Sequence, residues 1–276
     1  MFSFFYTRGG AGHVRGIQVA DWLKAKKNPT VDFKEDVCIY IKMEPPEDFP
    51  RHSYLDVVDA PRAVRFAKEH PSIGVIAISR VAQRHLCSLL GREDVFFIPH
   101  HHCNFENELR PDREVKTVGI IGSRNSFQFP AEELREKLKA IGLELLYDQD
   151  HWQHYNNEPN EEGKDSREKV CRFYQKVDIQ VVFRPEAWSP AFEPLRSPLK
   201  LENAGSFGIP SVCYPEPSYV DEFGGCFIEA ETIDKLVEEC QKLKENKDYY
   251  FYYSKRAISR ASEYHISRVS RLYYAL

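Results

Sequence analysis

Short runs of valine, isoleucine and aromatic residues recur along the chain, and between them apolar residues return at every third or fourth position. The short runs predict β-strands that are buried on both faces, whereas the longer spacing predicts amphipathic helices. Because strands and helices alternate nearly throughout, the pattern indicates parallel sheets with helices on both faces. The predicted fold class is therefore α/β.

The alternation forms two series separated by a polar stretch. The first series predicts strands at residues 2–6, 37–42, 54–58, 73–79 and 95–99 and helices at residues 13–25, 61–70 and 81–90. The second predicts strands at residues 115–121, 143–147, 177–183 and 210–214 and helices at residues 130–141, 166–175, 199–207, 232–244 and near the C-terminus. The charge-mixed stretch 101–114 is the candidate linker between the two series, and the polar composition of residues 148–165 predicts a long loop. We therefore expect two Rossmann-like domains, residues 1–108 and 109–259.

The composition limits the location and the partners. The chain has 276 residues, 42% hydrophobic and 29% charged, with a net charge of -4, which suits two domains and lacks the basic excess of a nucleic-acid binder. No basic leader opens the sequence, and no segment approaches the ~20 apolar residues that cross a bilayer. We expect a cytoplasmic protein with no nucleic-acid partner.

The cysteines, seven in number, are scattered, and several stand inside apolar runs. This pattern indicates buried free thiols in a reducing compartment, without a disulfide framework or a zinc site. The run His100–Cys103 could ligate a metal, but adjacent side chains on an extended chain point to opposite sides and no second cluster is obvious. We expect no metal and no cofactor, and His100 is a candidate cleft residue at the domain junction.

A glycine-rich turn follows the first predicted strand. Gly9, Gly10 and Gly12 would let backbone amides approach an anion or a sugar at the start of the next helix. The run is not a P-loop, since no Gly-Lys-Ser/Thr follows, and not a dinucleotide fingerprint, since Arg15 stands where the third glycine belongs. A tight turn without a ligand remains the alternative.

A second candidate phosphate site ends the first strand of the second series. Gly122, Ser123 and Arg124 lie at the edge where open α/β sheets bind ligands. The planar fork of donors on Arg124 can grip a phosphate.

The most specific pattern lies at residues 184–212. Arg184-Pro185-Glu186 follows a predicted strand, residues 193–206 lead into a helix, and residues 208–212 return to a strand as Gly-x-Pro-x-Val. This pattern resembles the nucleotide-binding half of glycosyltransferases of the GT-B fold, especially the retaining glycosyltransferase family 4-like group (group 1 transferases). The glycine-rich turn resembles the acceptor-side loop of that family, so the likeness touches most of the chain.

The resemblance implies two Rossmann-like domains facing each other across a cleft, with residues 260–276 crossing back to the first domain. It implies transfer of a hexosyl or pentosyl group from a nucleoside-diphosphate sugar to a hydroxyl of a glycan or another acceptor, with retention and without a metal. UDP and GDP both stay open as the nucleotide. A sugar-nucleotide epimerase of the same fold and a non-catalytic nucleotide- or glycan-binding module are the alternatives.

The resemblance also implies roles for single residues. Glu202 would accept hydrogen bonds from both ribose hydroxyls, and Lys200 and Arg124 would neutralise the diphosphate. The expected donor-binding set is Gly10, Gly12, Gly122, Ser123, Arg124, Arg184, Arg196, Ser197, Leu199, Lys200 and Glu202. The chain departs from the family in the spacing of Glu193 and Glu202, which is one residue wider than is typical, and in lacking the usual lysine after the arginine.

The predicted catalytic residues depend on the stereochemistry. With retention the departing phosphate oxygen can take the acceptor proton, whereas inversion needs a base, for which Asp56, Asp59 and His13 are candidates. Glu193 is a further expected catalytic residue. Capping of the next helix is the alternative role of Asp59. The aromatic and basic residues that begin at Tyr249 fit the packing face of a C-terminal helix, and they leave a peripheral membrane contact open.

Overall fold

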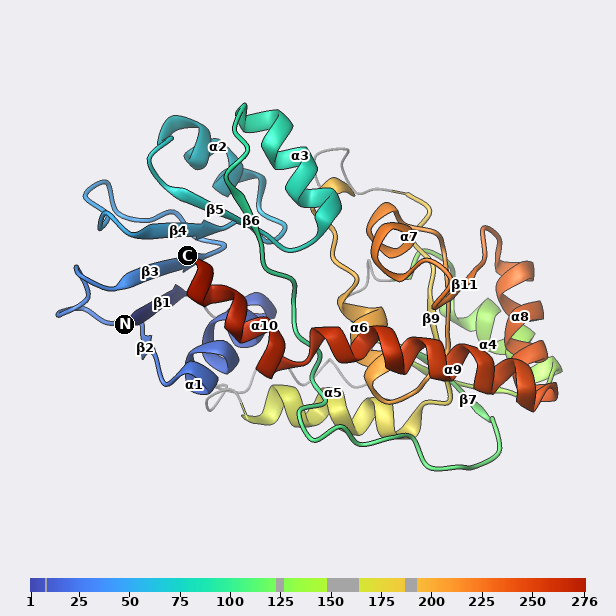
Figure 1. Ribbon diagram of the computed structural model, residues 1–276. Helices are drawn as coiled ribbons and strands as arrows, with labels where there is room; N and C mark the ends of the chain where they lie inside the picture. The colour runs from blue at the N-terminus through green and yellow to red at the C-terminus, as the bar shows by residue number, and fades with distance from the viewer. Residues whose placement is uncertain (8, 123–126, 148–163, 187–192) are drawn as a thin grey trace. The chain divides into compact units, whose positions relative to one another are not determined.

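The computed structural model describes residues 1–7, 9–122, 127–147, 164–186 and 193–276 (Figure 1). Contacts within the chain divide it into two compact units. The first consists of Met1–His101, Trp188–Pro198 and Tyr264–Leu276, and the second of His102–Ala187 and Leu199–Glu263. Each unit is built on one sheet, and the described strand pairs are parallel, so the predicted α/β class is confirmed.

The sheet of the first unit has six strands in the order β2-β1-β3-β4-β5-β6. They are β1 (Phe2–Tyr6), β2 (Lys26–Lys27), β3 (Val37–Ile41), β4 (Ser53–Asp56), β5 (Gly74–Ala77) and β6 (Val95–Phe97). The winding reverses between β1 and β3, because β2 lies on one side of β1 and β3 to β6 follow on the other. Open α/β sheets bind their ligands at the carboxyl ends of the strands beside such a reversal.

Alternate residues of β3 explain the long apolar runs of the sequence. Cys38 and Tyr40 belong to one hydrophobic cluster of the unit, and Ile39 and Ile41 belong to another. Successive side chains of a strand point to opposite faces, so both faces of this sheet are buried.

Helices cover the first sheet. They are the π-helix η1 (Gly12–Gln18) and the α-helices α1 (Val19–Leu23), α2 (Pro61–Glu69), α3 (Arg80–Leu90) and α10 (Ile266–Leu272). Pro61 occupies the first turn of α2, where its missing N–H has no helical partner to lose. Ser79 caps α3 by accepting a hydrogen bond from the Ala82 amide, and Gly91 ends that helix with a left-handed φ of 65°.

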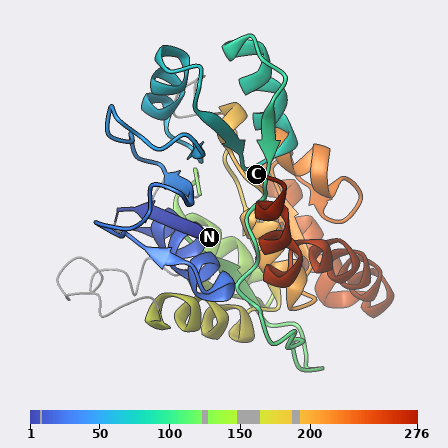
Figure 2. The ribbon, with the colours of Figure 1, turned by 60° about the vertical axis from the view of Figure 1, so that its left-hand side comes forward.

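The C-terminal segment is part of the core of the first unit. Val269 and Tyr273 belong to the cluster that contains Phe4, and the Phe4 and Tyr273 rings meet edge to face with centroids 5.4 Å apart. The hydroxyl of Tyr54 donates to the main-chain oxygen of Leu276. Figure 2 shows this segment, in red, beside the blue β1.

The second unit has a five-stranded sheet in the order β11-β10-β9-β7-β8. Its strands are β7 (Thr117–Ile120), β8 (Glu144–Tyr147), β9 (Ile179–Val182), β10 (Ser211–Cys213) and β11 (Ile228–Glu229). Its helices are α4 (Ala131–Ala140), α5 (Lys164–Lys176), α6 (Leu199–Ser206), α7 (Pro217–Phe223), α8 (Ile233–Glu245) and α9 (Lys247–Ala261). The winding reverses between β7 and β9.

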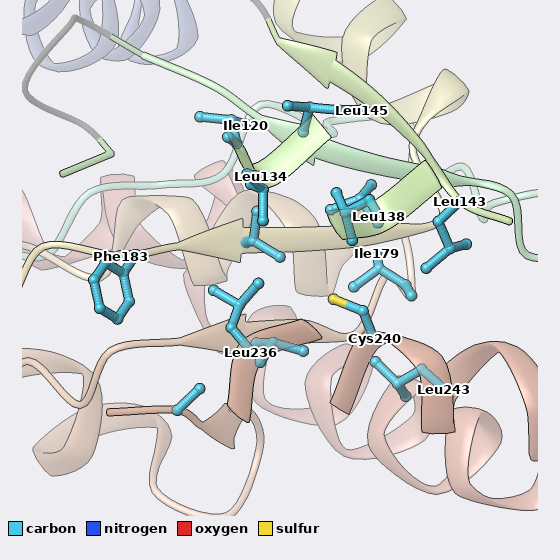
Figure 3. Packing of buried hydrophobic residues seen from close by; sticks show 14 of the residues in the cluster. Ile120, Leu134, Leu138, Leu143, Leu145, Ile179, Phe183, Leu236, Cys240 and Leu243 are labelled. Atoms are coloured by element: carbon cyan, nitrogen blue, oxygen red, sulfur yellow. The ribbon is translucent and has the colours of Figure 1, made fainter. Parts of the chain in front are cut away.

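The core of the second unit lies between the sheet and the helices α4 and α8. Leu134 and Leu138 of α4 and Leu236 and Cys240 of α8 pack in one cluster with Ile179 of β9 (Figure 3). These helical residues follow the spacing of three and four positions that the sequence displays.

Several elements differ from the sequence prediction. The helix expected at residues 13–25 begins as a π-helix and ends at Leu23, because Lys24 adopts a left-handed φ of 53°. β2, β11 and α7 were not predicted: each of these strands has two residues, and α7 begins at Pro217 just after Pro215. The expected loop 148–165 lies outside the described residues except for 164 and 165, which belong to α5. In the described ranges, no helix has both the length and the apolar character that crossing a bilayer requires.

Candidate functional site

The reversal point of the second sheet is bordered by the ends of β7 and β9. Gly122 follows β7 with a φ of 117°, a conformation that side-chain-bearing residues rarely adopt. Ser123 and Arg124, both expected to bind the diphosphate, lie outside the described residues. Of the three residues expected to bind at this edge, Gly122 is therefore the one that the structure describes.

The loop after β9 is fixed by Gln128. Its side-chain amide donates to the carbonyl of Glu186 at 2.9 Å, and its side-chain oxygen accepts from the Glu186 amide at 2.8 Å. The Gln128 backbone amide also donates to the Phe183 carbonyl at 2.7 Å. These hydrogen bonds hold residues 183–186 against the segment that precedes α4.

Arg184 is engaged by a protein carboxylate. Its Nε donates to Glu216 Oε1 at 2.6 Å and its Nη2 donates to Glu216 Oε2 at 2.7 Å, and the Glu216 side chain is 1% exposed. Burial opposes the charge of Arg184, but the neighbouring Tyr219 and Glu216 raise the pKa of Arg184 above its ordinary value. The guanidinium of Arg184, one of the expected donor-binding residues, is thus directed at Glu216, and a ligand would have to share it.

α6 carries Lys200 and Glu202, two of the residues that the sequence predicts to bind the donor. Lys200 is half-buried in the first turn, and Glu202 is fully buried. Gln180 of β9 donates from Nε2 to the Lys200 carbonyl at 3.1 Å and accepts the Tyr174 hydroxyl at 2.6 Å. This bridge sets the first turn of α6 against the central strand of the sheet.

The other end of α6 is also fixed. A Cβ added at Gly205 would lie 2.8 Å from the carbonyl oxygen of Ala257 in α9, so the two helices approach too closely for a side chain at that position. Asn203 accepts the Cys103 amide at 2.8 Å, and Asn104 donates to the Ser206 carbonyl at 2.9 Å. α6 is therefore a rigid support for Glu202.

The predicted catalytic residue Glu193 and the remaining donor-binding residues around it are divided between the two units. Glu193, Arg196 and Ser197 belong to the first unit, where Leu195 of the 3-10 turn η5 (Glu193–Leu195) is part of the hydrophobic core. Glu193 is exposed, and Arg196 and Ser197 are half-buried. Leu199, which is half-buried, Lys200 and Glu202 belong to the second unit.

The glycine-rich turn of the first unit packs closely against β1. A Cβ at Gly12 would lie 2.1 Å from the Thr7 carbonyl oxygen, and one at Gly16 would lie 2.4 Å from the Tyr6 ring. Gly10 differs, since a Cβ there meets nothing within 4 Å. Close packing accounts for Gly12 and Gly16, whereas it leaves Gly10 without a packing role.

Arg15, which follows this turn, is a buried residue that the sequence pattern did not single out. Its guanidinium is paired with Asp56, and it donates from Nη1 to the Pro99 carbonyl at 2.8 Å and from Nη2 to the Ile98 carbonyl at 3.0 Å. The side chain is 1% exposed. The sequence contains one signal for this role, since Arg15 lies between Gly12 and Gly16 in the helical segment that follows the first strand.

Three of the predicted catalytic residues, Asp56, Asp59 and His13, belong to the first unit. Asp56 is fully buried and pairs with Arg15; burial raises the pKa of Asp56, whereas the charge of Arg15 lowers it. Asp59 is half exposed and pairs with Lys42 at 2.6 Å, and its side chain does not cap α2. Partial burial lowers the pKa of His13.

The histidine run at the end of the first unit is buried. His100 is 5% exposed, and burial, together with the charge of Arg15, lowers the pKa of His100 well below its ordinary value. The Val14 carbonyl lies 2.8 Å from Nε2 of His101. In the described part of the chain, no group of three or more His, Cys, Asp or Glu side chains is arranged to hold a metal ion.

Comparisons with known proteins give matches of structure alone. No family model and no curated protein matches the sequence. HepE of Anabaena, solved in complex with UDP and glucose, has a TM-score of 0.64 at 10% identity over 99% of this chain and 98% of its own. A glycosyltransferase from Rickettsia africae has a TM-score of 0.61 at 12% identity over 99% and 96%.

A third match is longer than this chain. TarM has a TM-score of 0.60 at 11% identity over 88% of this chain and 54% of its own, so the chain spans about half the length of TarM. These matches, together with the two parallel-sheet units, agree with the fold that the sequence predicts. The chain has the fold of the GT-B glycosyltransferases.

Proposed function

We propose that the chain transfers a sugar from a nucleoside-diphosphate sugar to a hydroxyl group of an acceptor. The observation that carries the proposal is the position of Glu202, a fully buried carboxylate in the first turns of α6, in a chain of GT-B fold. A carboxylate held there can accept hydrogen bonds from two neighbouring ribose hydroxyls. HepE was solved with UDP and glucose, so a UDP-sugar is the first donor to test.

The diphosphate is proposed to meet the start of α6 and the end of β7. Backbone amides at a helix start carry partial positive charge, and Lys200 adds a full charge in the same turn. Gly122 lets the backbone approach a phosphate at the end of β7. Arg124 is the further cation proposed for this edge. These groups would bind the leaving diphosphate more tightly as its charge develops, which speeds bond breaking.

We propose that no metal is needed, since Lys200, Arg124 and the helix amides supply the positive charge that a divalent cation would otherwise bring. The measurement is the transfer rate before and after treatment with a chelator. An unchanged rate supports the proposal, and a loss that Mg²⁺ or Mn²⁺ restores contradicts it.

Retention of the anomeric configuration is proposed because the first unit uses Asp56 internally. With Asp56 paired to Arg15, the base that inversion requires would have to be Asp59 or His13. Retention avoids this need, since the departing phosphate oxygen can take the acceptor proton. The anomeric configuration of the product, read by NMR, decides between the two courses.

The test of the function begins with binding. Melting temperatures are measured with UDP, GDP, ADP and their sugars, because a ligand that binds only the folded state raises the melting point. We expect UDP to give the largest rise. The protein is then incubated with the bound nucleotide sugar and the products are identified.

The products separate the candidate functions. Free UDP with a transferred or hydrolysed sugar supports glycosyl transfer. An isomerised nucleotide sugar would instead indicate an epimerase, and binding without turnover would indicate a binding module. No binding of any nucleotide would overturn the proposal as a whole.

A further inference from the structure

Two cysteines of the second unit lie against each other although they are far apart in the sequence. Cys171, on α5, donates from its thiol to the Cys103 carbonyl at 3.3 Å. The Cys103 thiol also lies within hydrogen-bonding reach of the Cys171 thiol, and each shifts the pKa of the other. Figure 1 shows α5, in yellow, beside the green segment that carries Cys103. The two sulfur atoms are thus neighbours before any bond joins them.

Arg167, one turn before Cys171 on α5, binds the segment that contains Cys103. It donates from Nη1 to the same Cys103 carbonyl at 2.9 Å, and it forms a two-pronged pair with Glu106 at 2.8 Å on both oxygens. Its guanidinium also lies over the Phe105 ring, 4.4 Å from the centroid. These contacts fix the segment 103–106 against α5 and keep a positive charge near the Cys171 sulfur.

The two thiols have opposite electrostatic surroundings. The hydrogen bond from Cys103 lowers the pKa of Cys171, burial opposes this, and the charge of Arg167 lowers it further. Burial raises the pKa of Cys103 well above its ordinary value, and its hydrogen bond with Cys171 adds to the rise. Cys171 is therefore the better nucleophile, and Cys103 keeps its proton.

Cys171 is also reachable from solvent. It lines an open polar cavity of about 350 Å³ whose other lining residues include Glu106, Glu108, Arg167 and Arg172. Cys103 is only 7% exposed and packs with Phe173 and Phe207 in a hydrophobic cluster. A small oxidant can meet Cys171 in this cavity, whereas Cys103 is shielded from direct attack.

We propose that Cys103 and Cys171 form a redox pair that a hydroperoxide converts to a disulfide. The Cys171 thiolate attacks the peroxide O–O bond, taking one oxygen as sulfenic acid and releasing the other as water or, from an alkyl peroxide, an alcohol. Cys103 sulfur then attacks Cys171 sulfur, the S–O bond breaks, and the hydroxide that leaves takes the Cys103 proton as water. In total two thiols are oxidised by two electrons and one peroxide is reduced.

The disulfide would join α5 to the segment that supports α6. The Cys103 amide donates to Asn203, the neighbour of Glu202 on α6, so the crosslink is one hydrogen bond away from that helix. The inference does not depend on the proposed sugar transfer, because peroxide and thiols are the only reactants.

The test uses the full chain and hydrogen peroxide. The reduced protein is treated with a small excess of peroxide at neutral pH, remaining thiols are alkylated without reduction, and peptides are mapped by mass spectrometry. We expect the peptide pair joined through Cys103 and Cys171 to be the main crosslink, and dithiothreitol to return both thiols. The inference is overturned if Cys171 stays reduced while the half-buried Cys87 or Cys226 reacts, or if Cys171 ends as sulfinic acid without a crosslink.

Two variants sharpen the result. In Cys103→Ser the sulfenic acid on Cys171 has no partner, so we expect dimedone to capture it in greater yield than in the parent. Cys226→Ser is the matched control and should form the disulfide as the parent does. Circular dichroism confirms that each variant is folded, and if Cys103→Ser does not fold, the peptide map of the parent decides alone.

Discussion

Arg15 and Asp56 form an ion pair in the interior of the first unit, with side chains 1% and 0% exposed. The guanidinium also satisfies the carbonyls of Ile98 and Pro99, which lie just past β6. A charge in such a place is tolerated only while its partners remain, because desolvation of an unpaired ion costs several kcal/mol. Asp56 therefore stabilises the first unit by compensating the buried charge of Arg15.

Replacing one partner should be worse than replacing both. We expect Arg15→Met to lower the free energy of unfolding by about 3–5 kcal/mol, since it strands a buried carboxylate. The double variant Arg15→Met/Asp56→Leu should lose less than the sum of the two single variants, because it leaves no uncompensated charge. Urea unfolding of the four proteins measures the coupling, and strict additivity would contradict the pairing.

His100 makes the stability of the first unit depend on pH. Its folded-state pKa lies well below its ordinary value of 6.5, so below that pH the unfolded chain binds more protons than the folded one. The free energy of unfolding should therefore be highest above the ordinary pKa and should fall as the pH is lowered towards the folded-state pKa, by at most about 1.4 kcal/mol per pH unit for this group. Urea unfolding between pH 8 and pH 5 measures the slope. In His100→Gln the slope should flatten, and an unchanged slope would assign the effect to other groups.

Glu202→Gln tests the proposed ribose contact with a change of one atom. An amide oxygen accepts more weakly than a carboxylate, and hydrogen bonds to charged groups contribute about 1.5–3 kcal/mol each, so we expect UDP affinity to fall about tenfold or more. Calorimetric titration with UDP measures it. Glu229→Gln, at an exposed position on β11, is the matched control and should bind as the parent does. Equal affinities in Glu202→Gln and the parent would remove Glu202 from the ribose site.

At the scale of elements, the sequence predicts best where burial repeats. The sequence predicts the strands β1 and β3 from their continuous apolar runs. It predicts the helices α3 and α8 from apolar residues that return once per helical turn. β2 and β11 were not predicted, because a strand of two residues is too short to display a period. Periodicity reports burial along one element, and elements without a period have to be found from their neighbours in space.

The candidate site shows the same division. Glu202 lies inside a helix at the predicted place, because the Gly-x-Pro-x-Val run at residues 208–212 marks where α6 ends and the next strand begins. The pairing of Arg184 with Glu216 and that of Arg15 with Asp56 join residues far apart in the chain, and no local spacing signals them. Sequence patterns therefore locate candidate residues, whereas tertiary contacts determine which of them are already engaged.

The turn after β1 allows two glycines of the same run to be compared. Gly12→Ala should lower stability by several kcal/mol, because its Cβ would fall on the Thr7 carbonyl oxygen, a backbone atom that cannot easily move. Gly10→Ala should stay within about 0.5 kcal/mol of the parent, since nothing lies near its Cβ. Thermal unfolding compares the two variants. Equal losses would mean that the turn, and not the contact at Gly12, sets the stability.

At the scale of the molecule, the two sheets share a winding pattern but differ at their carboxyl edges. In the first sheet, Asp56 at the end of β4 binds Arg15, so protein side chains fill part of that edge. In the second, Gly122, two residues past the end of β7, has no side chain, and the fixed helix α6 carries Glu202. The difference favours the second unit for the proposed nucleotide site.

The hydrophobic clusters of the described chain each draw their residues from one unit, and the C-terminal segment supplies Val269 and Tyr273 to the first. Tyr273→Ala removes a ring that is 1% exposed and packed on Phe4, which should cost about 3–5 kcal/mol. We expect amide hydrogen exchange to speed up in β1, β3 and β4 while β7 and β9 keep the protection of the parent. Leu272→Ala, at a side chain that is 40% exposed, is the control and should leave both sheets protected. Equal loss of protection in the two sheets would mean that they unfold as one cooperative body, and that the core formed by the C-terminal segment stabilises the second unit as well as the first.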